Sequence, residues 1–529
     1  MSRIWNVIVL TLFLVAAIPL ATAAASEATA AGVELHEATI ASLQEEMAAG
    51  RLTSRALVEH FLARIESLDR HGPELHSVVE INPDALALAD GLDEERRTKG
   101  PRGPLHGIPI LLKDNIDTAD SMQTTAGSLA LMGSRPAKDA FLVARLREAG
   151  AVILGKTNLS EWANFRSTRS SSGWSARGGQ TRNPFDTQRN PCGSSSGSAV
   201  AVAAGLAVAA VGTETDGSIV CPSSTNGIVG IKPTVGLVSR SGIVPISISQ
   251  DTAGAMARTV EDAAVLLSAI AGEDVSDPAS ARRKPGTAPD LVAAAGEGSL
   301  RGVRIGVARN LAGFREEVDA LFDDAIRKLT NAGAIIVDRI DLKVPKAVQD
   351  DELTVLLYEF KDGLNRYLGS RPGAPRSLAE VIAFNTQERE REMPYFGQEL
   401  FLMAQSKGAL TDKAYVRARK RSLTLAGARG IDAALEKYRL DAIIAPTGGP
   451  AWSIDLVNGD HFVGGDASTL PAVAGYPHIT VPAGFVHGLP IGLSFFGTAW
   501  NEAGLIRHAA AFERISAVRR APVLAPAVE

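Results

Sequence analysis

The pattern of hydrophobic and polar residues predicts helices and buried strands in alternation. In residues 53–69 apolar side chains recur every three or four positions, and Thr53 is a suitable N-terminal cap. An amphipathic stretch that ends at a glycine and runs into a short apolar segment occurs at Gly150 and again at Gly333. A helix, a glycine and then a buried strand are typical of α/β proteins, in which helices cover a mostly parallel sheet.

Two further apolar stretches adjoin polar residues. Residues 108–113 follow a Pro/Gly turn, predict a buried strand and end at Lys113. Residues 191–200 read PCGSSSGSAV and run directly into an alanine- and valine-rich segment that predicts a buried helix. Serine and glycine at this density are typical of flexible linkers, but a linker does not continue into a core helix. We therefore expect a tightly turned, hydroxyl-rich backbone beside a buried element.

Composition narrows the class of protein. The chain has 529 residues, is 45% hydrophobic and carries a formal charge of −5. The charge is slightly negative and no RNA-binding motif occurs, so we expect no nucleic-acid partner. Residues 272–302 are polar and rich in proline and glycine, which fits a linker between domains or a surface excursion within one domain.

The N-terminus predicts export. Arg3 precedes an apolar run over residues 4–20, and small residues with A-x-A cleavage sites follow. Residues 1–25 are therefore predicted to be a secretory signal peptide, with a periplasmic or secreted mature protein that keeps no stable membrane partner. An uncleaved anchor is the alternative, since about 17 apolar residues can just span a bilayer. Pro19 and the alanine-rich exit favour cleavage.

Metal and cofactor motifs are missing from the sequence. The two cysteines, Cys192 and Cys221, are too few for a disulfide framework in a chain of this length. C-x-x-C and H-E-x-x-H do not occur, and the nine histidines lack ligand spacing. We expect neither a metal nor an organic cofactor.

Three segments together could form a nucleophile system: Lys113, the serines from Ser194 onwards, and VGTETDGSIVCP with Ser218. Each alone has an ordinary structural explanation, since lysines commonly end strands and serines beside glycine commonly form turns. A serine hydroxyl needs a base, and a lysine can be that base when burial lowers its pKa. A second serine could pass the proton between them.

The local sequence allows such a lysine to be neutral. Asp114 would hold it protonated if the two side chains met, but side chains alternate along a strand, so Asp114 should face away from Lys113. The turn at residues 216–218 could direct successive backbone N–H groups towards a developing oxyanion.

A rival hypothesis uses Ser195. Residues 193–197 match G-x-S-x-G, the nucleophile elbow of α/β-hydrolases. An elbow needs an apolar strand immediately before it, and RNPFDTQRNPCG cannot be one. The rival stays open because a histidine could come from later in the chain; the candidates are His461, His478, His487 and His508. A phosphate-binding loop is disfavoured because no G-K-[S/T] follows.

The three segments, in this order, resemble the amidase signature family. Ser194 and Ser218 are 24 positions apart, as in that family, and GKTNLSEWANF, TRNP, NGIVGIKPTVGLVS, DTAGAMARTV and LDAIIAPT are further similar stretches. The resemblance covers roughly residues 33–520. It implies one large α/β/α domain around a mixed, mostly parallel β-sheet.

The resemblance also implies roles for individual residues. Ser218 would be the nucleophile, Ser194 the bridging serine in a cis peptide bond, and Lys113 the base. Ser195 and Ser196 would satisfy backbone groups of the turn. The oxyanion hole would be formed by the backbone N–H groups of Thr215, Asp216, Gly217 and Ser218. The implied substrate-binding positions are Ala163 and Asn164.

The sequence departs from the common family pattern at two places. Cys192 precedes Gly193–Ser194 where many members have glycine, and Asp216 replaces a glycine near the nucleophile. Asp216 adds a side chain, and we expect a charge, beside the reacting carbonyl. With SEWANFR and GWSARGGQTRNP, these departures resemble the bacterial peptide amidases, which hydrolyse the C-terminal carboxamide of peptides to carboxylate and ammonia.

Three other functions remain open. The favoured substrate is the amide of a short peptide. The first alternative is a small aliphatic or aryl amide. The chain also resembles the amidase subunit of the glutamine-tRNA amidotransferase, although an export signal disfavours that role. A secreted binding protein without activity is disfavoured by the retention of all three catalytic positions. The oligomeric state stays undetermined.

The two cysteines flank the two serines. If Ser194 and Ser218 meet, Cys192 and Cys221 come close, and an oxidising compartment would allow a bridge. Closeness alone does not bring two Cα atoms to disulfide distance, and free cysteine is a common buried residue. We therefore favour two buried thiols over a Cys192–Cys221 disulfide.

Overall fold

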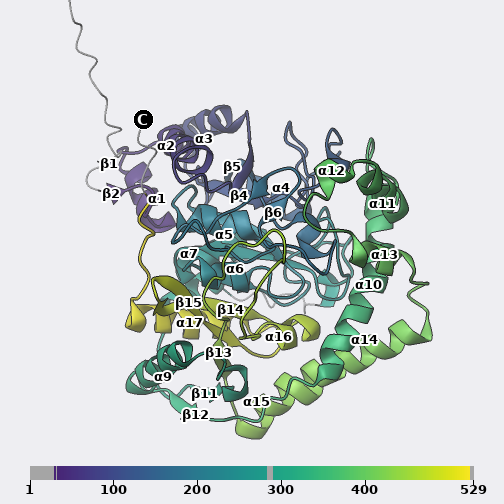
Figure 1. The fold of residues 1–529 in the computed structure, drawn as a ribbon. Coiled ribbons are helices and arrows are strands. Elements are labelled where there is room, and N and C mark those ends of the chain that lie inside the picture. Colours follow the sequence, from purple (N-terminus) through teal and green to yellow (C-terminus); the bar gives the residue numbers. More distant parts are fainter. Residues whose placement is uncertain (1–28, 31–32, 283–289, 525–529) are drawn as a thin grey trace, which may run out of the picture.

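The computed structural model describes residues 29–30, 33–282 and 290–524, and its centre is an eleven-stranded sheet. The order of its strands is β12-β11-β13-β15-β14-β9-β10-β8-β4-β5-β3 (Figure 1). These strands are β3 (Val78–Ile81), β4 (Pro109–Lys113), β5 (Val152–Thr157), β8 (Ala209–Glu214), β9 (Val229–Lys232), β10 (Thr252–Ala257), β11 (Arg304–Val307), β12 (Ile335–Val337), β13 (Ala442–Pro446), β14 (His478–Val486) and β15 (Leu489–Phe496). Two small ribbons accompany the sheet: β1 (Thr29–Ala30) with β2 (Val33–Glu34), and β6 (Trp174–Ser175) with β7 (Gly179–Gln180).

The sheet is mixed, as predicted, but it is not mostly parallel. Parallel pairing joins β5, β4 and β8 near one end and β12, β11 and β13 at the other. All pairs between β8 and β13 are antiparallel, as is β3 with β5. The helix–glycine–strand pattern reports each unit correctly but contains no information about how the units pair. The expectation of a mostly parallel sheet is therefore corrected, while the single α/β domain is confirmed.

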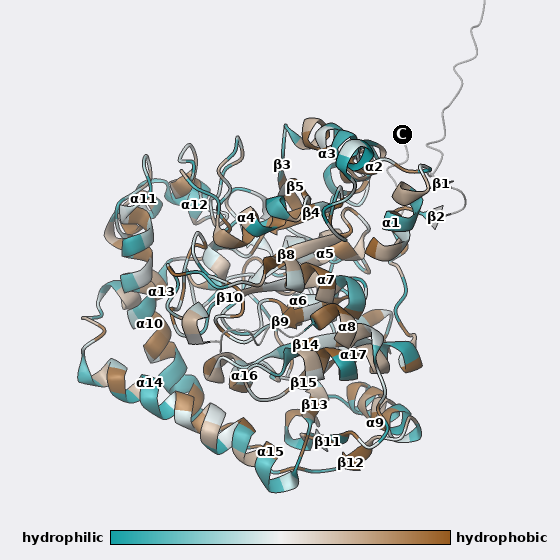
Figure 2. Ribbon diagram, turned by 180° about the vertical axis from the view of Figure 1, so that it is seen from behind, coloured by the Kyte–Doolittle hydropathy of each residue, from teal (hydrophilic) through white to brown (hydrophobic). Residues whose placement is uncertain are grey.

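Helices cover the sheet and complete its core. Helices α7, α8 and α17 pack against one another, with α7 on β8, β9 and β10 and α17 on β14 and β15. Helix α5 packs on β4, β5, β8 and β10, and α6 packs on β9, β14 and β15. Figure 2 shows the apolar residues of α7, α8 and α17 gathered over the strands.

The helices of the described residues have the following bounds. They are α1 (Ile40–Ala48), α2 (Ser54–Arg64), α3 (Ala85–Lys99), α4 (Phe141–Glu148), α5 (Ser196–Ala203), α6 (Val220–Thr225), α7 (Val260–Ile270), α8 (Leu291–Gly296), α9 (Glu316–Asn331), α10 (Lys346–Gly369), α11 (Leu378–Gln387), α12 (Arg389–Glu392), α13 (Glu399–Gln405), α14 (Lys413–Ala426), α15 (Asp432–Tyr438), α16 (Thr469–Ala474) and α17 (Glu502–Ser516). No described helix has the length and apolar character that a membrane crossing requires.

The elements predicted from sequence are present. Helix α2 begins after Thr53, whose side chain accepts a hydrogen bond from the Ala56 N–H, and a π-helical turn extends it to Arg70. Helices α4 and α9 are each followed by a glycine with positive φ, Gly150 at 79° and Gly333 at 94°. Strand β5 is fully buried, but β12 is the edge strand of the sheet, so Ile335 is 45% exposed.

Two other features of the chain clarify its organisation. Helix α8, within the proline- and glycine-rich region 272–302, buries Leu291 in the same core as α7 and α17, so this region is an excursion within one domain. Helices α10–α14 form an arc along one side of the sheet (Figure 1).

The predicted signal peptide, residues 1–25, lies outside the described residues.

Candidate active site

Lys113 ends a strand whose five residues are all buried. Its Nζ forms hydrogen bonds of 2.7 Å with Ser194 Oγ and 2.9 Å with Thr213 Oγ1, and lies 3.2 Å from the Thr213 carbonyl oxygen. None of the atoms bonded to it is a carboxylate oxygen. A lysine that is bonded to hydroxyls and a carbonyl can lose its proton more readily than one in an ion pair.

Burial dominates the electrostatics of Lys113. The side chain is 0% exposed. Loss of hydration lowers its pKa to about 7, against the opposing attraction of Glu214 and Asp251. Asp114 accepts hydrogen bonds from the Thr125 N–H and side chain and forms a 2.9 Å ion pair with Arg177. The prediction that Asp114 is directed away from Lys113 is confirmed.

The serine cluster forms the turn that leads into α5. The Gly193–Ser194 peptide bond is cis, as the family resemblance implied, and Ser194 is fully buried. Ser195 Oγ donates to the Thr213 carbonyl at 3.0 Å, and Ser196 Oγ donates to the Cys192 carbonyl at 2.6 Å. Ser195 and Ser196 therefore satisfy backbone groups, as predicted.

These bonds disfavour the rival nucleophile at Ser195. Its hydroxyl is buried, and a loop, not a strand, precedes its turn. Among the histidines proposed for that mechanism, His478 is bonded to Ser494 at 2.6 Å, while His461 and His487 have side chains 62% and 73% exposed. None of these contacts involves Ser195.

The segment that carries Ser218 follows β8 directly and lies beside the serine turn. The Ser195 N–H donates to the Ser218 carbonyl at 3.1 Å, which joins the two serine segments. Ser218 is 9% exposed. Gly217 has a φ of 75°, a conformation that favours glycine, and an added Cβ would lie 3.1 Å from Ser468 Oγ.

The side chains of residues 214–216 are all held by hydrogen bonds. Glu214 accepts from the N–H groups of Ile219 and Val220 at 2.7 and 3.1 Å. Thr215 Oγ1 donates to Asp251 at 2.6 Å. Thr469 Oγ1 donates to Asp216 at 2.8 Å. The turn is thereby fixed from several sides before any substrate binds.

The charge expected at Asp216 is only partly present at neutral pH. Burial and the neighbouring Asp466 raise the pKa of Asp216 to about 7. Burial and Asp216 also raise the pKa of Glu352, on α10, well above its usual range. Because these carboxyl groups repel one another, protons are retained among them at a pH where isolated carboxyl groups are ionised.

The two predicted substrate-binding residues lie on a left-handed turn. Ala163 and Asn164 have φ angles of 53° and 73°, and Trp162 before them has 51°. Asn164 Nδ2 donates to Ser172 Oγ at 3.2 Å. The turn begins beside the serine cluster, since the Ser160 N–H donates to the Ser194 carbonyl at 3.1 Å. Their role in substrate binding stays a prediction.

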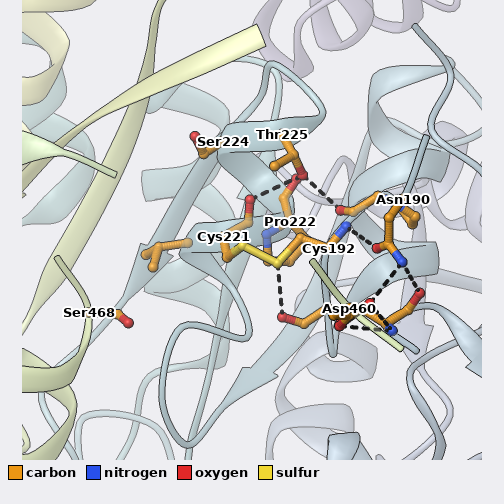
Figure 3. The surroundings of a disulfide bond; sticks show 12 residues. Asn190, Cys192, Cys221, Pro222, Ser224, Thr225, Asp460 and Ser468 are labelled. Carbon is orange, nitrogen blue, oxygen red and sulfur yellow. Dashed lines mark hydrogen bonds between the residues drawn. A yellow bond between two sulfur atoms is a disulfide. The ribbon is translucent and has the colours of Figure 1, made fainter. Parts of the chain in front are cut away.

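Cys192 and Cys221 form a disulfide, with a Cα–Cα distance of 6.0 Å (Figure 3). The prediction of two buried thiols is therefore wrong. It gave too little weight to the contact between the two serine segments, which brings the flanking cysteines within bonding range. The sequence signal was available in their positions, two residues before Ser194 and three after Ser218.

Sequence reasoning missed several residues that hold the site. Thr213 contacts Lys113, Asp251 holds Thr215, and Thr469 holds Asp216. Thr213 could have been found, because it lies in the same GTETDGS segment as Ser218. Thr469 carries no local signal, since it is separated from Asp216 by 253 positions and reaches it only through the fold.

Comparison with known proteins identifies the family of the chain. The family model named Amidase matches residues 56–506. The solved structure of the native peptide amidase from Stenotrophomonas maltophilia is 55% identical, with a TM-score of 0.87 over 92% of this chain and 99% of that one. A probable amidase from Arabidopsis thaliana is 42% identical over 503 residues, which is 92% of each chain. A glutamyl-tRNA(Gln) amidotransferase subunit from Chloroflexus aurantiacus is 38% identical over 91% of this chain and 97% of its own length.

The family match covers most of the chain, and the relatives align along nearly their whole lengths. From the sequence motifs, the mixed-sheet fold and these matches together, the chain belongs to the amidase family and is an amide-hydrolysing enzyme.

Proposed function

We propose that the protein hydrolyses the C-terminal carboxamide of peptides through an acyl-enzyme on Ser218. The observation that carries the mechanism is the 2.7 Å contact between Lys113 Nζ and Ser194 Oγ in a fully buried setting. The support for the substrate class is the 55% identity with the peptide amidase of Stenotrophomonas maltophilia. The residues that depart from the common motif, Cys192 and Asp216, also resemble that subgroup.

In this mechanism Ser218 Oγ attacks the amide carbonyl carbon, and its proton passes through Ser194 to neutral Lys113. The tetrahedral oxyanion is stabilised by backbone N–H groups of residues 215–218. The Gly217 N–H also stabilises the Glu214 carboxylate, so Thr215, Asp216 and Ser218 are the better donors. The proton returns to the leaving nitrogen, the C–N bond breaks and ammonia departs.

Water completes the cycle. It attacks the acyl carbon, gives a proton to the Ser194–Lys113 pair and releases the carboxylate as Ser218 recovers its proton. The Thr213 hydroxyl and carbonyl hold Lys113 Nζ towards Ser194 throughout. We expect this chemistry to need no metal and no organic cofactor.

The test of roles is a set of alanine variants. Ser218→Ala and Lys113→Ala should each abolish turnover while far-UV circular dichroism stays that of the wild type. Ser194→Ala should lose most activity. Ser195→Ala is the discriminating control: an inactive Ser195→Ala beside an active Ser218→Ala would replace this mechanism with the Ser195 elbow.

The test of substrate class compares three amides. The purified protein is incubated with an amidated dipeptide, the corresponding free dipeptide and propionamide. Both ammonia and free amino acids are measured, because cleavage of the peptide bond in the free dipeptide would release amino acids and no ammonia. Release from the amidated dipeptide alone is expected. A preference for propionamide would instead support the alternative of a small-amide amidase, and no release from any of them would reject hydrolysis of terminal carboxamides.

We also propose that the mature protein is exported. The predicted signal peptide and the Cys192–Cys221 disulfide are independent observations in its favour, because disulfides are rare in the cytosol. Both disfavour a role in a tRNA amidotransferase complex, which would act in the cytoplasm, despite the 38% identity. Fractionation of cells that express the full chain should find the protein outside the cytoplasm and shortened at its N-terminus.

A further inference from the structure

The disulfide joins the two segments that carry the proposed proton relay. Cys192 lies two residues before Ser194, at a φ of 57° and directly before the Gly193–Ser194 bond. Cys221 lies in the first turn of α6, and its N–H donates to the Gly217 carbonyl at 2.8 Å. The sulfur–sulfur bond therefore connects the backbone on one side of Ser194 with the backbone on the far side of Ser218.

Weaker contacts connect the same two segments. Thr225 Oγ1 and Asn226 Nδ2 donate to the Pro191 carbonyl at 2.8 and 2.9 Å. The Ser195 N–H donates to the Ser218 carbonyl at 3.1 Å. These bonds would keep the segments adjacent without the disulfide, so the fold does not depend on it alone. Hydrogen bonds stretch and exchange with water more easily than a covalent bond.

A third segment is held at the same point (Figure 3). Asn190 Oδ1 accepts from the Cys192 N–H at 2.8 Å, and its Nδ2 donates to Asp460 at 3.1 Å. Asp460 belongs to the loop between β13 and α16. Ser468, at the end of the same loop, lies against Gly217. The disulfide is thus the covalent member of a brace that includes both serine segments and the loop beside them.

We propose that Cys192 and Cys221 are positioning residues of the amidase reaction, whose disulfide fixes Ser194 relative to Ser218. This inference rests on the proposed relay between those serines. Proton transfer requires heavy atoms within about 2.6–3.2 Å, and a misplacement of about 1 Å can cost about 100-fold in rate. Turnover therefore depends on the oxidation state of the pair, whereas binding of the peptide and the fold depend on it much less.

An external dithiol can reduce the Cys192–Cys221 disulfide. A dithiol such as dithiothreitol supplies two electrons and two protons, the Cys192–Cys221 bond becomes two thiols, and the dithiol closes into its cyclic disulfide. Cys192 is 6% exposed and Cys221 is partly exposed, so the reagent approaches from the Cys221 side. An organic disulfide such as oxidised glutathione reverses the reaction.

The experiment measures kcat and KM of the full-length protein on an amidated dipeptide before and after reduction by dithiothreitol. Two thiols per denatured chain confirm reduction, and circular dichroism at the assay temperature confirms folding. We expect kcat to fall about tenfold, KM to change less than about twofold, and oxidised glutathione to restore the rate. The Cys192→Ala/Cys221→Ala variant should have the low kcat permanently and show no response to the reductant.

A matched control separates positioning from stability. Ile305→Val removes a buried methyl group on β11, near the far end of the sheet, and should lower the unfolding temperature without lowering kcat. The proposal is overturned if the fully reduced protein and the double variant keep the wild-type kcat, or if both lose their folded circular dichroism. The proposed relay is tested by a separate measurement. If the Ser218→Ala variant is active, the relay is rejected, whatever the response of the wild-type enzyme to reduction.

Discussion

Lys113 and Lys156 can be compared directly, because Lys113 is the last residue of β4, Lys156 is the last but one of the neighbouring parallel strand β5, and both are fully buried. Their local sequences are alike, ILLKDN and ILGKTN. In the register of β4 and β5, Lys156 pairs with Leu112 and Lys113 pairs with Thr157. Paired residues share a face of the sheet and successive residues alternate, so the two lysines point to opposite faces.

Their surroundings differ more than their burial. Lys113 Nζ contacts the Ser194 and Thr213 hydroxyls, and burial lowers its pKa to about 7. Lys156 Nζ contacts the Ile116 carbonyl at 2.5 Å and the Thr124 hydroxyl at 2.9 Å. Burial also lowers its pKa, to about 8, while four carboxylates led by Asp114 oppose the shift.

Burial alone therefore does not identify a catalytic lysine in this protein. Both side chains are desolvated, but only Lys113 touches a serine hydroxyl that is joined to a second serine segment. Lys156, on β5, donates a hydrogen bond to the Ile116 carbonyl in the segment after β4, and this contact has a structural role. The comparison can be broken by removing each lysine in turn.

The largest effect is expected for Lys113→Met. Methionine fills a similar volume without a titrating group, so loss of the base should lower kcat by about 1000-fold or more. The measurement is steady-state hydrolysis of an amidated dipeptide, with circular dichroism to show that the variant is folded. A rate within tenfold of the wild type would remove Lys113 from the mechanism.

The next effect concerns pH. If neutral Lys113 is the base, kcat/KM should fall about tenfold per unit as pH drops below about 7 and should level off above it. Asp216 also titrates near pH 7, so Asp216→Asn serves as the control and should keep this limb. Disappearance of the limb in Asp216→Asn would assign the titration to the carboxyl group.

Lys156→Met should affect stability more than chemistry. The variant removes the hydrogen bonds that Lys156 Nζ donates to the Ile116 carbonyl and the Thr124 hydroxyl, although Thr124 Oγ1 still donates to that carbonyl at 3.1 Å. We therefore expect a loss of about 1–3 kcal/mol of unfolding free energy for the two bonds together. The value of kcat at a temperature well below unfolding should change less than about tenfold. Denaturant unfolding and steady-state rates measure the two effects, and a loss of kcat as large as that of Lys113→Met would abolish the distinction.

The smallest effect is expected for Thr213→Val, which sharpens the difference in hydroxyl contacts. Valine keeps the shape of threonine but removes the hydroxyl that accepts from Lys113 and from Asn115. The Thr213 carbonyl still contacts Lys113 Nζ, so we expect kcat to fall about three- to tenfold with little change in KM. An unchanged kcat would show that Ser194 alone positions the lysine.

Much of the local structure could be predicted from sequence. The amphipathic period gave α2, α4 and α9 with their glycine stops, and the apolar runs gave β4, β5 and α5. It was also possible to predict the turn at residues 193–196 and the direction of the Asp114 side chain away from Lys113. Both depend on a few consecutive residues. Such features follow from backbone sterics and from solvent acting on short segments.

Strand pairing and the disulfide were not predicted correctly, because both depend on contacts between segments far apart in the chain. The helix–strand units are local, whereas the antiparallel run from β8 to β13 depends on which strand edges meet. The two cysteines had sequence evidence both for thiols and for a bridge, and the contact between the serine segments decided for the bridge.

The sequence by itself determined the residue types and spacing of the proposed relay, with Lys113, Ser194 and Ser218 in the order that the family resemblance implies. Only the tertiary structure decided which of two similar buried lysines meets a serine, and which residues hold the turn at Asp216. Thr213 on strand β8 accepts a hydrogen bond from Lys113, and Thr469 on helix α16 donates one to Asp216. The physical reason is that a pKa and a hydrogen bond depend on every group within a few ångströms, and the fold, not the spacing along the chain, brings those groups together.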